Sequence, residues 1–140
     1  MNMANQIRVE LRQISASASE ASIGLHRVTI DRPAAKGGTD AGPMGGELFL
    51  ASVGGCFMSN LLAAVKAREA PVSHVRVDVV GSIADSPARF ASVELSVSAE
   101  TTDQDLLQRL VEIADRGCIM MNTLRAALDV RVLTVIPASA

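Results

Sequence analysis

The sequence predicts an α+β protein in which antiparallel sheets pack against one long central helix. Two observations support this class. The stretch from Leu48 to Val65 is apolar on nearly every side, as in a helix that other elements surround. Segments of alternating apolar and polar residues come before and after it in the chain, a pattern typical of half-buried strands. The predicted order of elements is ββαββααβ.

Length and charge limit the possible functions. The 140 residues are expected to form a single domain, residues 1–140, that buries most of its apolar surface. A net charge of −2 and a pI near 5.6 provide no basic field, so nucleic acid is not an expected partner. The N-terminal residues lack the apolar core of a signal peptide, and we expect a cytoplasmic protein. Two cysteines in that compartment are more often free, metal-bound or redox-active than a structural bridge.

The first elements are predicted to be two strands that pair as a hairpin. Residues Gln6 to Ile14 alternate between apolar and polar, and Ile23 to Ile30 resumes the strand character. The small polar run from Ser15 to Ser22 between them is predicted to be a turn. Pro33 ends the hairpin, and a glycine-rich loop leads from there to the central helix. Loops of that kind often line functional sites.

The central helix is predicted to run from Gly46 to Arg68, a length of roughly 34 Å at 1.5 Å per residue. Pro43 stands just before it and Pro71 just after it, where proline is tolerated. A membrane span is the competing interpretation. Polar residues and glycines interrupt the apolar run and no aromatic anchors flank it, so we expect no membrane association.

The polar residues of this helix lie on one face. They are spaced by three and four positions: Ser52, Cys56, Ser59 and Asn60. Gly54 and Gly55, directly before the cysteine, each cost about 1 kcal/mol in a helix interior. Their presence indicates close approach of another backbone or a local bend.

Two more strands are predicted after the central helix. His74 to Ile83 and Arg89 to Ala99 both alternate strictly between apolar and polar residues. The residues between them, Ala84 to Ala88, contain a proline and are predicted to form the turn of an antiparallel pair.

The chain is predicted to end with two helices and a strand. Thr102 and Asp105 resemble a capping box at the start of a helix that ends near Gly117. A short helix from Cys118 to Leu128 follows, and Val130 to Ile136 is the last strand.

Short motifs around the two cysteines resemble the OsmC/Ohr family. The motifs are GP, EL, LA and GGC between Gly42 and Cys56, together with Cys118 at the head of a later helix and NTL after it. The resemblance covers essentially the whole chain in element order. The family comprises small α+β homodimers, many of which are thiol peroxidases for organic hydroperoxides. The resemblance therefore implies an OsmC-like fold, with Cys56 as the thiolate that attacks the peroxide and Cys118 as the resolving thiol that forms a disulfide with it.

The resemblance also implies the partners. They are a second copy of the chain, an organic hydroperoxide substrate and a dithiol reductant that the sequence does not identify; no cofactor is expected. The central helix supports the dimer independently, because one five-stranded sheet and two short helices would hardly cover a helix that is apolar on all faces. A second subunit would supply the missing cover.

Local electrostatics favour the opposite roles for the two thiols. A peroxidatic cysteine must be a thiolate, and a free cysteine titrates near 8.5 unless its surroundings lower the pKa. Cys118 lies at a predicted helix N-terminus with Arg116 nearby, whereas Cys56 lies mid-helix and gains little from the helix dipole. This argument selects Cys118 as the more acidic thiol. Either cysteine alone is also explained as a small core hydrophobe.

Two residues that contact the reactive thiol in peroxidase members are missing. The family has a glutamate ten residues before the first cysteine, where this chain has Gly46, and an arginine in the early hairpin turn, where this chain has none. Glu47, nine residues before Cys56, points about 180° away on a regular helix and suits the helix N-terminus instead. The remaining candidates for the arginine are Arg12, Arg27 and Arg32. These departures favour an alternative function, a non-catalytic dimer of the same fold that binds a small hydrophobic ligand.

Other candidate sites are weaker. His26 and His74 with the two cysteines have none of the spacings of a zinc site, and no metal is expected. Arg125 would lie two turns after Cys118 and suits either an anionic substrate or solvent. The methionines near the cysteines suit an oily pocket or ordinary core packing: Met44, Met58, Met120 and Met121.

Overall fold

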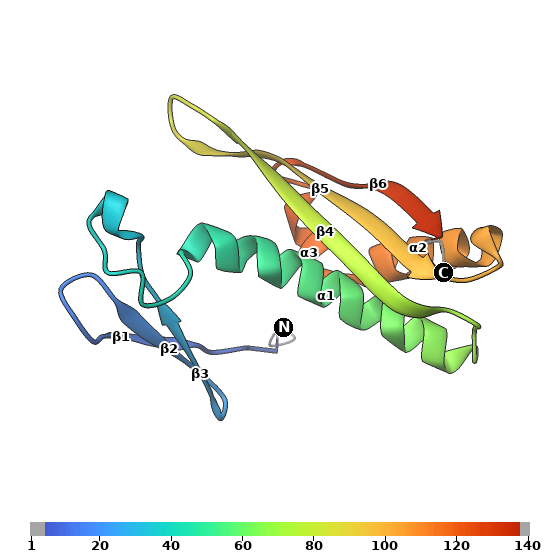
Figure 1. Ribbon diagram of the computed structural model, residues 1–140, viewed down its shortest axis with the longest axis horizontal. Coiled ribbons are helices and arrows are strands. Elements are labelled where there is room, and N and C mark those ends of the chain that lie inside the picture. The colour runs from blue at the N-terminus through green and yellow to red at the C-terminus, as the bar shows by residue number, and fades with distance from the viewer. Residues whose placement is uncertain (1–4, 138–140) are drawn as a thin grey trace, which may run out of the picture. The chain divides into compact units, whose positions relative to one another are not determined.

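The computed structural model describes residues 5–137 and confirms the α+β class (Figure 1). The chain divides into two compact units, and the boundary in the sequence falls between Leu48 and Phe49. The elements are β1 (Glu10–Gln13), β2 (Ser19–Ile23), β3 (His26–Ile30), the short 3-10 helix η1 (Ala34–Lys36), α1 (Gly45–Ala67), β4 (Ser73–Ala84), β5 (Arg89–Glu100), α2 (Gln104–Gly117), α3 (Ile119–Leu124) and β6 (Asp129–Pro137).

The first unit contains an antiparallel sheet of order β1-β2-β3. The predicted element order holds with one addition, because three strands and not two come before α1. The run from Ser15 to Ser22, predicted as a turn, contains most of β2, whose central residue Ala21 is buried between Leu11 and Val28 in the sheet register. The turn of the second hairpin is at Gly24, which adopts a positive φ of 58°.

Strand β1 is shorter and more exposed than predicted. All four of its residues are exposed in the chain, and so are Ile7 and Val9 before it. The apolar residues whose alternation predicted a half-buried strand are therefore exposed in the single chain.

The loop from 31 to 43 is folded tightly around Asp31. Its buried carboxylate accepts hydrogen bonds from the backbone of Arg32 and Ala41 and from both the backbone and the hydroxyl of Thr39. A Cβ at Gly38 would overlap the carbonyl of Arg32, so this position requires glycine. The loop is glycine-rich because its backbone doubles back on itself.

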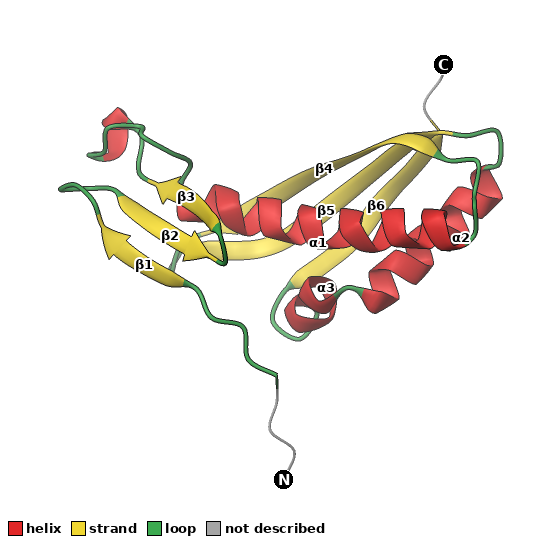
Figure 2. Ribbon diagram, turned by 90° about the horizontal axis from the view of Figure 1, so that it is seen from below, coloured by secondary structure: helices red, strands yellow, loops and turns green. Residues whose placement is uncertain are grey.

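The second unit contains a sheet of order β4-β5-β6, and α1, α2 and α3 cover one face of it (Figure 2). Strands β4 and β5 are antiparallel, as predicted. Strand β6 differs from the prediction because it pairs in parallel with β5. Helices α2 and α3 form the connection between β5 and β6, and a parallel pair needs a crossover of that length.

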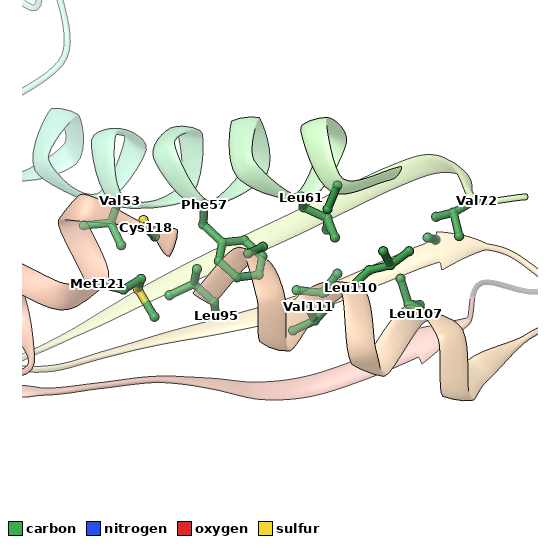
Figure 3. Close-up of a cluster of buried hydrophobic side chains, with 14 of the residues drawn as sticks. Val53, Phe57, Leu61, Val72, Leu95, Leu107, Leu110, Val111, Cys118 and Met121 are labelled. Atoms are coloured by element: carbon green, nitrogen blue, oxygen red, sulfur yellow. The ribbon is translucent and has the colours of Figure 1, made fainter. Parts of the chain in front are cut away.

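The core of the second unit lies between the sheet and the helices (Figure 3). Strand β5 contributes alternate buried residues to it, while the serines and glutamates between them stay partly exposed on the other face. The buried side chains from β5, the helices and the junction between α2 and α3 are Val93, Leu95, Val97, Ala99, Val53, Phe57, Leu61, Ala64, Leu107, Leu110, Val111, Ala114, Cys118 and Met121.

Helix α1 runs from Gly45 to Ala67, close to the predicted bounds. Only one face of it is buried in the chain, and Leu62 on another face is 49% exposed. A Cβ at Gly54 would lie 2.7 Å from Val79 of β4, whereas a Cβ at Gly55 meets nothing. Close packing therefore explains the first glycine but not the second. By length and hydropathy α1 resembles a membrane span, yet its buried face belongs to the core.

The later helices differ in detail from the prediction. The N-cap of α2 is Asp103, whose carboxylate accepts from the backbone N–H of Leu106 over 2.9 Å, and not Thr102. Helix α2 ends at Gly117 as predicted. Helix α3 is shorter than predicted, and Cys118 is its N-cap.

Candidate functional site

Cys56 lies near the middle of α1, at the edge of the face that packs on the core. The residues on either side of it along this edge, Val53 and Phe57, are fully buried, whereas Cys56 is partly exposed. This position anchors the thiol on a helix and leaves the residue partly exposed.

Cys118 lies in the junction between α2 and α3, where the backbone leaves helical geometry with φ −83° and ψ 116°. Both of its backbone polar groups are hydrogen-bonded: its N–H donates to the carbonyl of Asp115, and its carbonyl accepts from Asn122. The side chain is completely buried beneath α1, beside Val53 and Met121 (Figure 3). The junction therefore fixes the second thiol inside the core.

The structure brings the two cysteines together. The Cys118 Sγ donates to the Cys56 Sγ across 3.3 Å, although the residues are 62 positions apart. Both thiols are free. A disulfide bond is about 2.05 Å long, so the sulfurs would have to approach by a little over 1 Å, which side-chain rotation can provide. The buried residues of the surrounding core, such as Val53, Phe57 and Met121, are apolar.

Burial opposes ionisation of the Cys118 thiol. Removal from water raises the pKa of Cys118, and the adjacent Cys56 sulfur raises it further. The backbone N–H groups of Met121 and Met120 act in the opposite direction, but the side chain makes no capping hydrogen bond to them. The expected lowering of the Cys118 pKa by the helix N-terminus is therefore wrong, because that expectation left out the burial of the side chain.

Arg12, Arg27 and Arg125 have other partners, whereas no ion pair is described for the side chain of Arg32 among residues 5–137. Arg12 and Arg27 both form ion pairs with Glu20 within the first unit. Arg125 binds the carboxylate of Asp115 and the side-chain oxygen of Asn122. The structure thus assigns these three side chains to surface ion pairs.

Glu47 and His74 have local roles. The Glu47 carboxylate accepts from the backbone N–H of Met44 over 2.9 Å, which supports its predicted position at the helix N-terminus. His74 lies 3.0 Å from the carboxylate of Glu100. Between residues 5 and 137 no group of three or more histidine, cysteine or acidic side chains is arranged to hold a metal ion.

The model of the OsmC-like protein family matches residues 37–132. The chain belongs to the OsmC-like family. The matched segment contains both cysteines, all of α1 and the whole core described above. No protein with a curated description matches the chain.

Solved structures of OsmC-like proteins share the fold over nearly the whole chain. An OsmC-like protein from Mycoplasma pneumoniae has a TM-score of 0.84 at 16% identity, with 97% of this chain and 100% of that chain covered. An organic hydroperoxide resistance protein from Elizabethkingia anophelis has a TM-score of 0.76 at 21% identity, with 99% and 100% covered. The organic hydroperoxide resistance protein OhrB of Bacillus subtilis has a TM-score of 0.70 at 23% identity, with 93% and 98% covered.

The sequence reveals only part of the surroundings of the two thiols. Val53 and Phe57 follow from helical spacing, because they are three residues before and one residue after Cys56 on the apolar side. Met121 is the third residue of α3. The sequence predicted that this helix begins at Cys118, and it did not indicate that Met121 packs beside the thiols. The extended backbone at Cys118 that turns the thiol toward α1 has no sequence signal.

Proposed function

We propose that the protein is a thiol peroxidase that reduces organic hydroperoxides through Cys56 and Cys118. One observation supports this most strongly: a partly exposed thiol lies 3.3 Å from a buried one, with the buried thiol as donor. The exposed sulfur suits attack on a substrate, and the buried sulfur suits a second step that needs no access from solvent. Relatives of the same fold that are named organic hydroperoxide resistance proteins support the substrate class.

The proposed reaction has two oxidative steps. The Cys56 thiolate attacks the terminal oxygen of R–O–OH, the O–O bond breaks, and the alkoxide takes a proton and leaves as R–OH. Cys56 is then a sulfenic acid. The Cys118 sulfur attacks the Cys56 sulfur, the S–O bond breaks, and the hydroxide takes the Cys118 proton and leaves as water. A disulfide between the two cysteines remains.

A dithiol completes the proposed cycle. It supplies two electrons and two protons, which restore both thiols and leave the reductant as its own disulfide. Because the second step uses a sulfur already in contact with the first, over-oxidation of Cys56 should be slow while Cys118 is present.

The surroundings of the pair suit a hydrophobic peroxide. Val53, Phe57 and Met121 pack beside the thiols, and no charged side chain is buried in the core of the second unit among its described residues. An alkyl or aryl hydroperoxide should therefore react faster than hydrogen peroxide. We further propose that the protein acts as a homodimer of single OsmC-like domains, residues 1–140, in the cytoplasm.

The rate of thiol loss after one equivalent of cumene hydroperoxide tests the proposal. We expect both thiols to disappear much faster than the thiol of free cysteine at the same pH, and hydrogen peroxide to act more slowly. Equal rates for the protein and for free cysteine would contradict it.

A second candidate is a non-catalytic dimer of this fold that binds a small hydrophobic ligand. It is favoured by Gly46, which stands in the position of the expected glutamate, and by Glu47, whose carboxylate is engaged with Met44. Slow thiol loss with cumene hydroperoxide, together with saturable binding of a hydrophobic fluorescent probe, would favour this function.

A further inference from the structure

The Cys56 sulfur needs a hydrogen-bond donor if it is to be a thiolate near neutral pH. A free cysteine has a pKa near 8.5, which leaves only a few per cent of thiolate at pH 7. Mid-helix position gives Cys56 little help from the dipole of α1. Gly46 provides no side chain at the position where the family places a glutamate.

The donor that the second unit offers is the other thiol. Among residues 49–137, the hydrogen bond described at the Cys56 sulfur comes from the Cys118 Sγ over 3.3 Å. A hydrogen bond to the charged form of a group stabilises that form and lowers its pKa. The two sulfurs that would later form the disulfide are thus already in contact, with Cys118 as the donor and Cys56 as the acceptor.

Burial determines which sulfur keeps the proton. Cys118 is fully buried and Cys56 partly exposed, so water can solvate a negative charge on Cys56 but not on Cys118. The raised pKa of Cys118 agrees with this order. Its backbone is held at both polar groups by Asp115 and Asn122, so Cys118 is fixed beside Cys56 before any substrate arrives.

The charged groups at the end of α2 and just after α3 do not point into the core. At the end of α2, Asp115 binds Arg125, and the side chain of Arg116 is exposed. The buried residues that α1 and β5 contribute to the surrounding core, such as Val53, Phe57 and Leu95, are apolar. The Cys118 thiol is therefore a polar group in a position to act on Cys56 from within this unit, with its Sγ 3.3 Å from the Cys56 Sγ.

We propose that Cys118 acts before it forms any disulfide, by donating its S–H to Cys56 and stabilising the attacking thiolate. The inference rests on the proposed function for the attack itself, but the stabilised thiolate exists without a peroxide. The same proton later leaves with the hydroxide of the sulfenic acid as water, so atoms and charge balance. One sulfur thus serves first as donor and then as nucleophile.

Two variants at Cys118 separate these roles. Cys118→Ser keeps an O–H donor and cannot form a disulfide, whereas Cys118→Ala has neither property. The measurement is the rate of Cys56 alkylation by iodoacetamide between pH 5 and 10, with the modified site identified by mass spectrometry. Only the thiolate reacts, so the midpoint of the profile reports the pKa of Cys56.

We expect the midpoint in Cys118→Ala to lie about one pH unit above that in Cys118→Ser, with alkylation at pH 7 slower by roughly tenfold. Equal midpoints in the two variants would overturn the inference. Val111→Ala is the matched control, because it loosens the same core without touching either thiol and should leave the midpoint at the wild-type value. If Cys118→Ala does not fold, Cys118→Val fills the space without a donor and replaces it.

This test does not depend on peroxidase activity. A raised midpoint in Cys118→Ala together with no peroxide reduction by the wild type would support the donor role and refute the proposed function. Equal midpoints together with rapid peroxide reduction would refute the donor role alone.

Discussion

Asp31 is a buried carboxylate that holds the loop before α1 by hydrogen bonds from Arg32, Thr39 and Ala41. The Thr39 hydroxyl, followed by the two backbone N–H groups, lowers the pKa of Asp31 well below its ordinary value, against the opposing effect of burial. All of these partners are hydrogen-bond donors, so they stabilise the ionised carboxylate of Asp31.

Asp31→Asn should lower the melting temperature at pH 7, because an amide turns N–H groups toward these donors. The folded-state pKa is depressed, so the charge contributes stability above the unfolded-state pKa of about 4, and this contribution is lost as the pH falls below it. Thermal melts at pH 7 and pH 3 should show that the wild type loses more stability on acidification than Asp31→Asn does. Asp40→Asn, in the same loop but exposed, is the control, and an equal effect of both substitutions would contradict the prediction.

The two thiols could be found from the sequence, but the raised pKa of Cys118 could not. Local motifs point to Cys56 and Cys118, and the structure places the two sulfurs in contact. Acidity depends on burial, which arises from the packing of Cys118 beneath a helix distant in the chain. A helix N-terminus is visible in a sequence, whereas the loss of water around it is not.

At the scale of elements, α1 and β4 pack closely at one glycine. A Cβ at Gly54 would lie 2.7 Å from the Val79 side chain, so Gly54→Ala should destabilise the protein by about 1–3 kcal/mol. Urea denaturation followed by circular dichroism measures the change. Gly55→Ala is the matched control, since its added methyl meets nothing in the chain and alanine is the better helix former by about 1 kcal/mol. A Gly54→Ala variant as stable as the wild type would show that the helix and strand can move apart without cost.

Elements with a strong apolar period were predicted closely. Strands β4 and β5 lie within about one residue of their predicted ends, because large aliphatic residues alternate along them. Strand β2 was missed because its inward residue is alanine among serines, so it shows little hydrophobic contrast. The parallel pairing of β6 was missed because a strand's neighbours depend on the whole chain and not on its own pattern.

At the scale of the whole molecule, much apolar surface is uncovered in the single chain. Leu62 of α1 is 49% exposed, and Leu11 and Ile23 of the first sheet are 56% and 41% exposed. Both three-stranded sheets also have edge strands. Exposed apolar surface and free strand edges are the features that a second subunit covers.

We therefore expect sedimentation equilibrium at micromolar concentration to give twice the chain mass of 14.6 kDa. Leu62→Glu, which places a charge on the exposed face of α1, should shift the equilibrium toward monomer while the chain stays folded. A wild-type mass of a single chain would contradict the dimer.

The central claim is that Cys56 attacks the peroxide and Cys118 closes the disulfide. Its most direct test compares peroxide-dependent thiol loss in the wild type and the two single-cysteine variants, with intact masses measured after one equivalent of cumene hydroperoxide. We expect the wild type to lose both thiols reversibly, Cys118→Ser to react and then over-oxidise toward sulfinic acid, and Cys56→Ser to react no faster than free cysteine. If Cys56→Ser keeps the wild-type rate while Cys118→Ser loses it, the roles are reversed; if both variants match the wild type, the thiol cycle is wrong.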